Sequence, residues 1–165
     1  LEFRRVLFRS KMYYQGNRDF LEIPEPKVGE YDFSFSGIKT AVINFVNKMK
    51  MKGEEFSNED LAASFLGKVV DILCKKTLKA AKEKGVKTII LAGGVAANSL
   101  LRSQLTEGAK KMGIDVFYPS MKLCTDNAAM IAEAAYYKLI NCKDGKSCFA
   151  DLDLNGVATL NVIDD

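Results

Sequence analysis

The stretch that decides the fold is Val86–Leu101, VKTIILAGGVAANSLL. Its first half is typical of a buried β-strand, the pair Gly93-Gly94 follows, and the second half has the pattern of a helix. Paired glycines after a strand let a ligand lie against bare backbone, because no Cβ stands in the way. Free N–H groups at the start of the next helix favour a phosphate or another anion. The order therefore predicts a nucleotide- or anion-binding corner, although a βα turn that needs glycine only for its geometry explains the pair equally well.

Upstream of this corner the sequence predicts one strand and two helices. The alternation in Asp32–Ser36, DFSFS, indicates a half-buried strand, and Ser36 is a reasonable N-cap for a helix over Ile38–Met51. A capping box that begins at Ser57 opens a long helix, and Gly85 is a natural stop for it. We interpret the lysines near the end of that helix as a solvated end that complements the helix dipole, rather than as a binding patch.

Downstream of the corner the pattern continues as helix, strand and helix. The first helix runs to about Met112, a short strand follows over Asp115–Tyr118, and Thr125-Asp126 opens the last helix. The resulting order, β-α-α-β-α-β-α, predicts an α/β fold with a partly parallel sheet flanked by helices.

The composition of the 165 residues fits one globular domain, with 48% hydrophobic and 27% charged residues. The net charge of +3 is no strong sign of nucleic-acid binding, because the first ten residues hold three arginines and one glutamate. Without them 21 basic residues face 20 acidic ones, and no basic stripe remains. We interpret residues 1–10, LEFRRVLFRS, as translated adapter or assembly sequence.

The sequence shows no secretory signal and no membrane span, so we expect a cytoplasmic protein with reduced thiols and no membrane contact. Its four cysteines have no zinc-site spacing, although Cys142 and Cys148 could approach each other. Histidine is absent from the chain. This absence excludes a histidine general base or a histidine-ligated metal site built by this chain alone.

Three loops are expected to meet beyond the carboxyl ends of the strands, where open α/β sheets bind ligands. They contain Ser36-Gly37, Gly93-Gly94 and Cys124–Asn127. The carboxamide of Asn98 can hydrogen-bond a ribose or a base, or it can cap its own helix. Asp126, which we place in the first turn of the last helix, either caps that helix or offers a carboxylate to a metal or a metal-bound phosphate.

At these positions the chain resembles the C-terminal part of the tRNA threonylcarbamoyladenosine synthase family, the N6-threonylcarbamoyltransferases once described as O-sialoglycoprotein endopeptidases. Three blocks carry the resemblance: Tyr31–Thr40 (YDFSFSGIKT), Leu91–Arg102 (LAGGVAANSLLR) and Tyr118–Ala132 (YPSMKLCTDNAAMIA). They occur in the family's order. The resemblance covers residues 11–155, which we expect to be the C-terminal lobe, and leaves residues 156–165 as a tail.

The resemblance implies the second lobe of an actin- and Hsp70-like (ASKHA) ATPase fold. It also implies transfer of a threonylcarbamoyl group from threonylcarbamoyl-AMP to N6 of adenosine 37, in tRNAs that read codons beginning with A. By the family's motifs, Asn98 contacts the adenylate, Gly93 and Gly94 line the nucleotide cleft, and Asp126 ligates a metal, usually iron. The implied partners are tRNA, a non-catalytic paralogue and a small ATPase of the bacterial complex.

The chain also departs from the family. The family's metal is held by two histidines of an HxxxH motif in the first lobe, and this chain has no histidine. We therefore expect a fragment that is inactive alone, in which Asn98 and Asp126 form one wall of a cleft and the opposite wall lies on other polypeptide. The alternatives are a non-catalytic ASKHA paralogue that serves as a dimerisation scaffold, and another ASKHA nucleotide-binding kinase.

Overall fold

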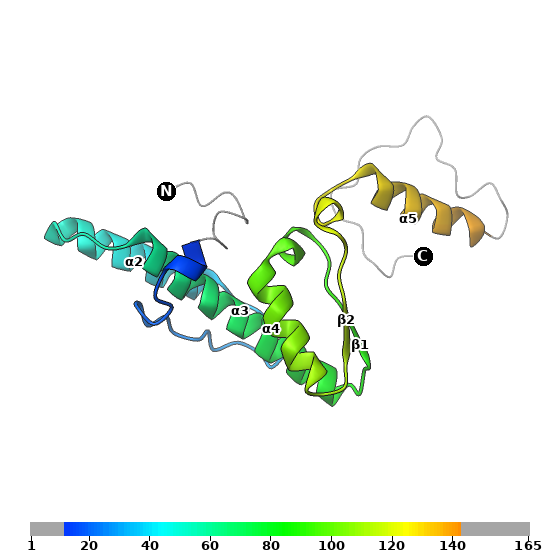
Figure 1. Cartoon of the computed structure of the whole chain (residues 1–165), viewed down its shortest axis with the longest axis horizontal. Coiled ribbons are helices and arrows are strands. Elements are labelled where there is room, and N and C mark those ends of the chain that lie inside the picture. Colours follow the sequence, from blue (N-terminus) through cyan, green and yellow to red (C-terminus); the bar gives the residue numbers. More distant parts are fainter. Residues whose placement is uncertain (1–11, 143–165) are drawn as a thin grey trace. The chain divides into compact units, whose positions relative to one another are not determined.

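The computed structural model describes residues 12–142, which divide between two compact units, Leu1–Thr125 and Asp126–Asp165 (Figure 1). The first unit contains α2 (Ser36–Lys52), α3 (Asn58–Glu83), β1 (Thr88–Ile90), the 3₁₀ turn η1 (Gly94–Ala97), α4 (Ser99–Lys110), β2 (Asp115–Phe117) and the 3₁₀ turn η2 (Met121–Leu123). The second unit contains α5 (Ala128–Ile140).

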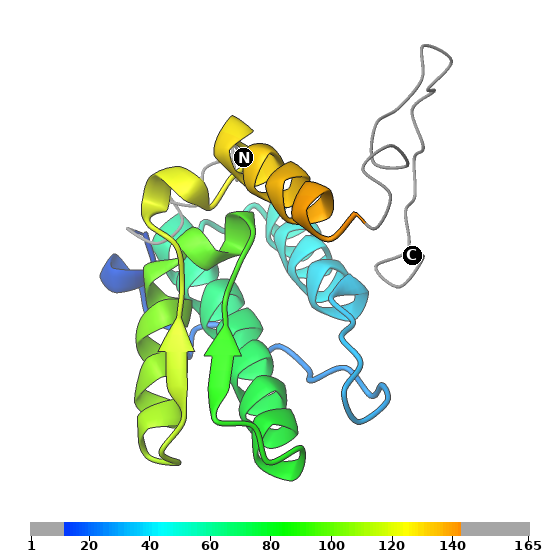
Figure 2. The same ribbon diagram turned by 90° about the vertical axis from the view of Figure 1, so that its right-hand side faces the viewer.

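The first unit is built in two layers. Strands β1 and β2 pair in parallel, with Ile89 opposite Val116, and helices α3 and α4 lie side by side against one face of the pair (Figure 2). The core between the layers consists of buried apolar residues: Leu66, Val70, Cys74, Ala81, Ile89, Leu100, Leu101, Leu105, Ala109 and Ile114. The predicted α/β class and the parallel pairing are confirmed. That this unit is the second lobe of an actin-like fold stays a prediction.

The outer face of the strand pair is open. Ile90 and Phe117 stand opposite each other in the register, and their side chains are 77% and 59% exposed. Ile89, the residue before Ile90 in β1, points to the opposite face and is buried against the helices. The strand pair thus has one buried face and one exposed face, on which Thr88 and Asp115 lie beside the apolar pair Ile90 and Phe117.

Helix α3 begins and ends as the sequence predicts. Ser57 is its N-cap, and the Ser57 Oγ accepts a hydrogen bond from the Asp60 N–H at 3.1 Å. Gly85 follows the C-terminal residues with φ +65, in the left-handed region where glycine carries no steric cost. Both signals lie within a few residues of the helix end, so the sequence alone locates them.

The predicted strand over Asp32–Ser36 is wrong. The segment before Ser36 is irregular, and Ser36 is the first residue of α2 rather than its cap. The alternating rings of Phe33 and Phe35 stack on each other with centroids 6.2 Å apart. The backbone carbonyl of Asp32 accepts a hydrogen bond from the Lys76 ammonium of α3. A side chain thus satisfies this carbonyl, a backbone group that a strand would have paired with a neighbouring strand.

The lysines of α3 do more than end a helix. Lys75 pairs with Glu25 at 3.0 Å, and Lys79 pairs with Glu30. The hydrogen bond from Lys75 holds the pKa of Glu25 below its usual value. The interpretation of these lysines as a solvated helix end is therefore incomplete, because their ion pairs hold the connecting segment, which contains Glu25 and Glu30, against α3.

Several predictions concern the ends of the chain or the cysteines. Residues 1–10 and 156–165 lie outside the described residues. Cys74 and Cys124 are buried free thiols, whereas Cys142 is disulfide-bonded, so the expectation of reduced thiols is wrong at that position. Within residues 12–142, every helix is too short or too polar to span a lipid bilayer.

We expect Cys74 to resist alkylation by iodoacetamide at pH 8 in the folded chain and to react after denaturation in urea. Burial against α4, together with the negative charge of Asp71, raises the pKa of the Cys74 thiol from 9.0 to about 11, and the thiolate is the reactive form. Because folding favours the protonated thiol, its contribution to stability is present below pH 9 and is lost as the pH rises towards 11. Peptide mass spectrometry measures the labelling, and rapid labelling of Cys74 in the native chain would contradict the packing described above.

Candidate functional site

The backbone at Gly93-Gly94 is open to solvent just beyond the carboxyl end of β1. Gly93 has φ +83 and ψ 177, a conformation that is essentially restricted to glycine. A Cβ built on either glycine meets no heavy atom within 4 Å, and both residues are exposed. The bare backbone that a nucleotide would require is therefore present, while contact of these glycines with a ligand stays a prediction.

The helix after the glycines begins later than the sequence predicts. The turn η1 comes first, and within it the Ala96 N–H donates to the Gly93 carbonyl at 3.0 Å. The Asn98 N–H likewise donates to the Val95 carbonyl at 3.0 Å. These two N–H groups donate within the turn. They are therefore not free to bind an anion, although the strand–glycine–helix pattern predicted free N–H groups at this point. A 3₁₀ turn of four residues is too short to show a periodic pattern in the sequence, which is why it was not predicted.

Asn98 is the N-cap of α4 and is only 4% exposed. Its Oδ1 accepts a hydrogen bond from the Leu101 N–H at 3.0 Å. Of the two roles considered for this carboxamide, the structure contains the capping role. The Nδ2 group is the part of the side chain left for a ligand, because one acceptor is already committed to the helix. A contact between Asn98 and an adenylate stays a prediction.

Asp126 does not lie in the first turn of the last helix. Asn127 is the N-cap of α5, with its Oδ1 accepting from the Met130 N–H at 3.0 Å, and the helix begins at Ala128. Because Asn127 holds the cap, capping of α5 by Asp126, one of the two roles considered for this carboxylate, is wrong. The Asp126 side chain is exposed. Because Asn98 and Asp126 belong to different compact units, their placement on a common cleft wall stays a prediction.

The described residues do not by themselves make a metal site. Within residues 12–142 no group of three or more His, Cys, Asp or Glu side chains is arranged to hold an ion, and the whole sequence lacks histidine. Asp126 can supply one oxygen ligand of the kind that hard cations prefer. One carboxylate does not fix a metal, so ligands from outside residues 12–142 would be required.

Two of the three predicted loops are connected. Arg102 in α4 donates from Nη2 to the Pro119 carbonyl at 3.0 Å and to the Cys124 Sγ at 3.1 Å, and its Nε donates to the Ala96 carbonyl. It therefore joins the turn after β1 to the loop after β2. The third predicted loop, Ser36-Gly37, does not follow a strand. The reason for expecting it beside the other two loops therefore does not hold. No local pattern in the sequence reveals this role of Arg102, since its partners include distant carbonyls.

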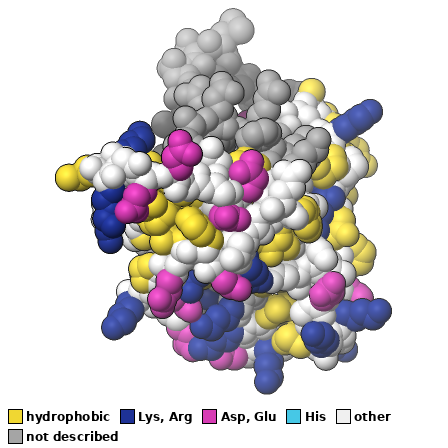
Figure 3. Space-filling view, turned by 60° about the vertical axis from the view of Figure 1, so that its left-hand side comes forward, with side chains coloured by type: hydrophobic (Ala, Val, Ile, Leu, Met, Phe, Trp, Pro, Cys, Tyr) yellow, Lys and Arg dark blue, Asp and Glu magenta, His cyan; other side chains and the backbone are white. Residues whose placement is uncertain are grey.

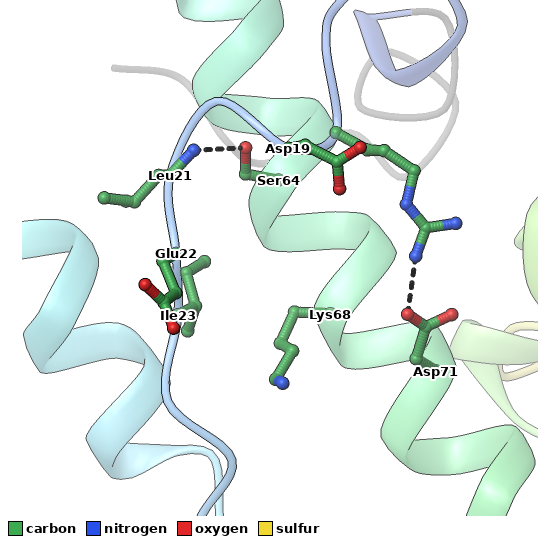
Figure 4. Close-up of a pocket in the computed structure, with 8 residues that line it drawn as sticks. Asp19, Leu21, Glu22, Ile23, Ser64, Lys68 and Asp71 are labelled. Atoms are coloured by element: carbon green, nitrogen blue, oxygen red, sulfur yellow. Dashed lines mark hydrogen bonds and ion pairs between the residues drawn. The ribbon is translucent and has the colours of Figure 1, made fainter.

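A separate pocket of about 330 Å³ lies between the segment at residues 18–23 and α3 (Figure 4). Arg18 pairs with Asp71 at 2.6 Å on one side of it, and that charge raises the pKa of Arg18. The Leu21 N–H donates to the buried Ser64 Oγ at 3.0 Å. These bonds attach the connecting segment to α3. No sequence motif pointed to this pocket.

The charges on the surface are mixed. On the face shown in Figure 3, lysine and arginine side chains lie among aspartates and glutamates rather than in a continuous basic stripe. This distribution agrees with the nearly balanced composition. Charge alone therefore gives no sign of a nucleic-acid surface on that face.

Comparison with known proteins identifies the family. A family model described as tRNA N6-adenosine threonylcarbamoyltransferase matches residues 3–133. Proteins of the same name are 76% identical in Fusobacterium nucleatum over 94% of this chain, 51% identical in Clostridioides difficile over 89%, and 46% identical in Clostridium beijerinckii over 93%. The chain spans 46%, 43% and 44% of the length of these relatives. The chain therefore belongs to the tRNA N6-adenosine threonylcarbamoyltransferase family.

Proposed function

We propose that this chain provides part of the active site for transfer of a threonylcarbamoyl group from threonylcarbamoyl-AMP to N6 of adenosine 37, in tRNAs that read codons beginning with A. Family membership supports the reaction class. The chain acts as the second lobe of an actin- and Hsp70-like fold and is inactive alone, because it spans less than half of its relatives' length. The rest of the cleft comes from polypeptide outside these residues.

The observation that carries this proposal is the open glycine turn after β1. Gly93 holds a conformation that other residues rarely adopt, and the space beside both glycines is free of protein atoms. A phosphate or ribose of the adenylate can approach this backbone within hydrogen-bonding distance. Adjacent to the turn, Asn98 keeps its Nδ2 donors for the same ligand while its Oδ1 caps α4.

The exposed carboxylate of Asp126 supplies one ligand of a metal ion, iron by analogy with the family. The described residues form no complete site for that metal by themselves. The contribution of this chain to the chemistry is binding and orientation of the adenylate. A fixed adenylate places the carbamoyl carbon for attack by the adenine amine, and orientation of this kind accounts for much of the rate of group-transfer enzymes.

The proposed partners are those of the bacterial threonylcarbamoylation complex in the cytoplasm: tRNA as substrate, a non-catalytic paralogue and a small ATPase. The face in Figure 3 carries mixed charges and offers no continuous basic surface for the tRNA phosphates. These partners rest on the resemblance to the family.

The test joins this chain to the part of the Fusobacterium nucleatum relative that it does not cover. The completed enzyme receives threonylcarbamoyl-AMP and tRNA, and mass spectrometry of the digested tRNA detects threonylcarbamoyladenosine. We expect product from the completed enzyme and none from the 165-residue chain alone. Product formation should fall by about tenfold or more in Asp126→Asn, since even residues that only orient metal ligands have effects of this size.

The matched control is Asp115→Asn, another exposed carboxylate, at the start of β2. It should leave product formation unchanged. Equal product from both variants would refute the role of Asp126. A completed enzyme that binds tRNA but makes no product would favour the scaffold paralogue, and phosphoryl transfer to a small metabolite would favour a kinase.

A further inference from the structure

Arg102 occupies a central position between the two loops that follow the strands. Its Nε donates to the carbonyl of Ala96, in the turn after β1. Its Nη2 donates to the carbonyl of Pro119, in the loop after β2, at 3.0 Å. One side chain from α4 thus contacts the backbone of both loops.

The fit of the guanidinium to this place is specific. The guanidinium lies over the ring of Tyr118, with its Cζ atom 4.4 Å from the ring centroid. A guanidinium is planar, stays charged at all relevant pH values and directs several N–H donors from one rigid group. A lysine ammonium is a single point donor on a flexible stem. It cannot reach both carbonyls and stack on the ring at the same time.

Cys124, which lies two residues before the start of the second unit in the sequence, also contacts Arg102. Its Sγ accepts from Arg102 Nη2 at 3.1 Å and donates to the Ser120 carbonyl at 3.4 Å. The side chain is 2% exposed, so the hydrogen bonds are protected from water. Cys124 is the second residue before Asp126 in the sequence.

We propose that Arg102 is a positioning residue, which holds the glycine turn after β1 and the Pro119–Cys124 loop in one fixed arrangement. Through α4 it is four residues from Asn98, and through Cys124 it fixes the point from which the chain continues to Asp126. In this role Arg102 acts through the two loops rather than by contact with substrate or metal. Its structural role follows from the contacts above, and its effect on catalysis rests on the function proposed in the preceding subsection.

The structural part is tested by hydrogen exchange on the 165-residue chain. In Arg102→Lys and Arg102→Gln we expect faster amide exchange in residues 93–98 and also in residues 120–124, with unchanged exchange in α3. The control Lys110→Gln removes an exposed cation from the same helix and should change neither loop. Unchanged exchange in both loops, or faster exchange in only one, would overturn the proposal.

The catalytic part is tested in the completed enzyme described above. We expect Arg102→Lys to lower kcat by about 10- to 100-fold, the size of effect expected from a small misplacement of reacting groups, while the KM for tRNA stays constant. Cys124→Ser keeps an acceptor for Arg102 and should retain kcat, whereas Cys124→Ala should lower it. If Arg102 only stabilised the fold, the activity per folded molecule would be the same in all variants, and the proposal would fail.

The two failures can be told apart. A wild-type completed enzyme without transferase activity would refute the proposed function, and the exchange experiment would still decide whether Arg102 joins the loops. An active wild-type enzyme whose Arg102→Lys variant has normal kcat would refute the positioning role alone.

Discussion

Replacing Asn98 with serine is expected to leave the fold intact and to weaken adenylate binding, whereas alanine should damage both. Serine retains a side-chain oxygen that can cap α4 in place of the Asn98 Oδ1, which accepts from the Leu101 N–H. Alanine removes the cap and should lower the free energy of unfolding by about 0.5–2 kcal/mol. Urea denaturation of the 165-residue chain, followed by circular dichroism, measures this difference.

Adenylate affinity separates the capping role from the binding role. Serine lacks the Nδ2 donors, so loss of a ligand hydrogen bond should raise the dissociation constant of an adenylate analogue in the completed enzyme by about tenfold. Ser103→Ala serves as the control, because Ser103 is exposed on the same helix and contacts the Glu107 side chain. Wild-type affinity in Asn98→Ser would show that Asn98 only caps its helix.

Gly93→Ala is expected to destabilise the chain, and Gly94→Ala is not. Gly93 has φ +83 and ψ 177, where an alanine costs about 1–3 kcal/mol. Gly94 has no positive φ and begins the turn η1. An added methyl group there meets open space, so the free energy of unfolding should change by no more than about 0.5 kcal/mol. Denaturation in urea measures both variants.

Ligand binding should fall in both glycine variants. Each methyl group would occupy the space through which a phosphate approaches the backbone, so calorimetry with the adenylate analogue on the completed enzyme should give weaker binding for Gly94→Ala at full stability. Gly94→Ala with wild-type affinity would mean that the ligand does not approach this backbone. In that case the glycines serve only the geometry of the turn.

Local signals predicted the helices well. The Ser57 cap and Gly85 mark the ends of α3, because capping depends on residues within one turn of the helix end. The parallel pair β1 and β2 followed from two short apolar segments joined by a helix. The strand predicted over Asp32–Ser36 is wrong, because the alternation of apolar and polar residues describes only how the side chains are distributed. The pairing of the backbone depends on a partner that the alternation does not specify.

The candidate site was predicted in part. The sequence located the glycine turn and Asn98 near it, because glycine and asparagine carry their conformational preferences with them. It could not show the turn η1 before α4 or the shift of Asp126 out of the first turn of α5, where Asn127 takes the cap. Arg102 went unrecognised for another reason. It donates hydrogen bonds to carbonyl groups 6 and 17 residues away. Because every residue type has a carbonyl, the sequence does not single out these partners.

The strand pair has a practical consequence for anyone who produces this polypeptide. In the described part of the chain β1 and β2 pair only with each other, so the other edge of each has no strand partner there and can recruit a strand from another molecule. The exposed side chains of Ile90 and Phe117 add apolar surface beside those edges, which favours association with other molecules. Purification at low concentration, or co-expression with the rest of the enzyme, is the natural safeguard against precipitation.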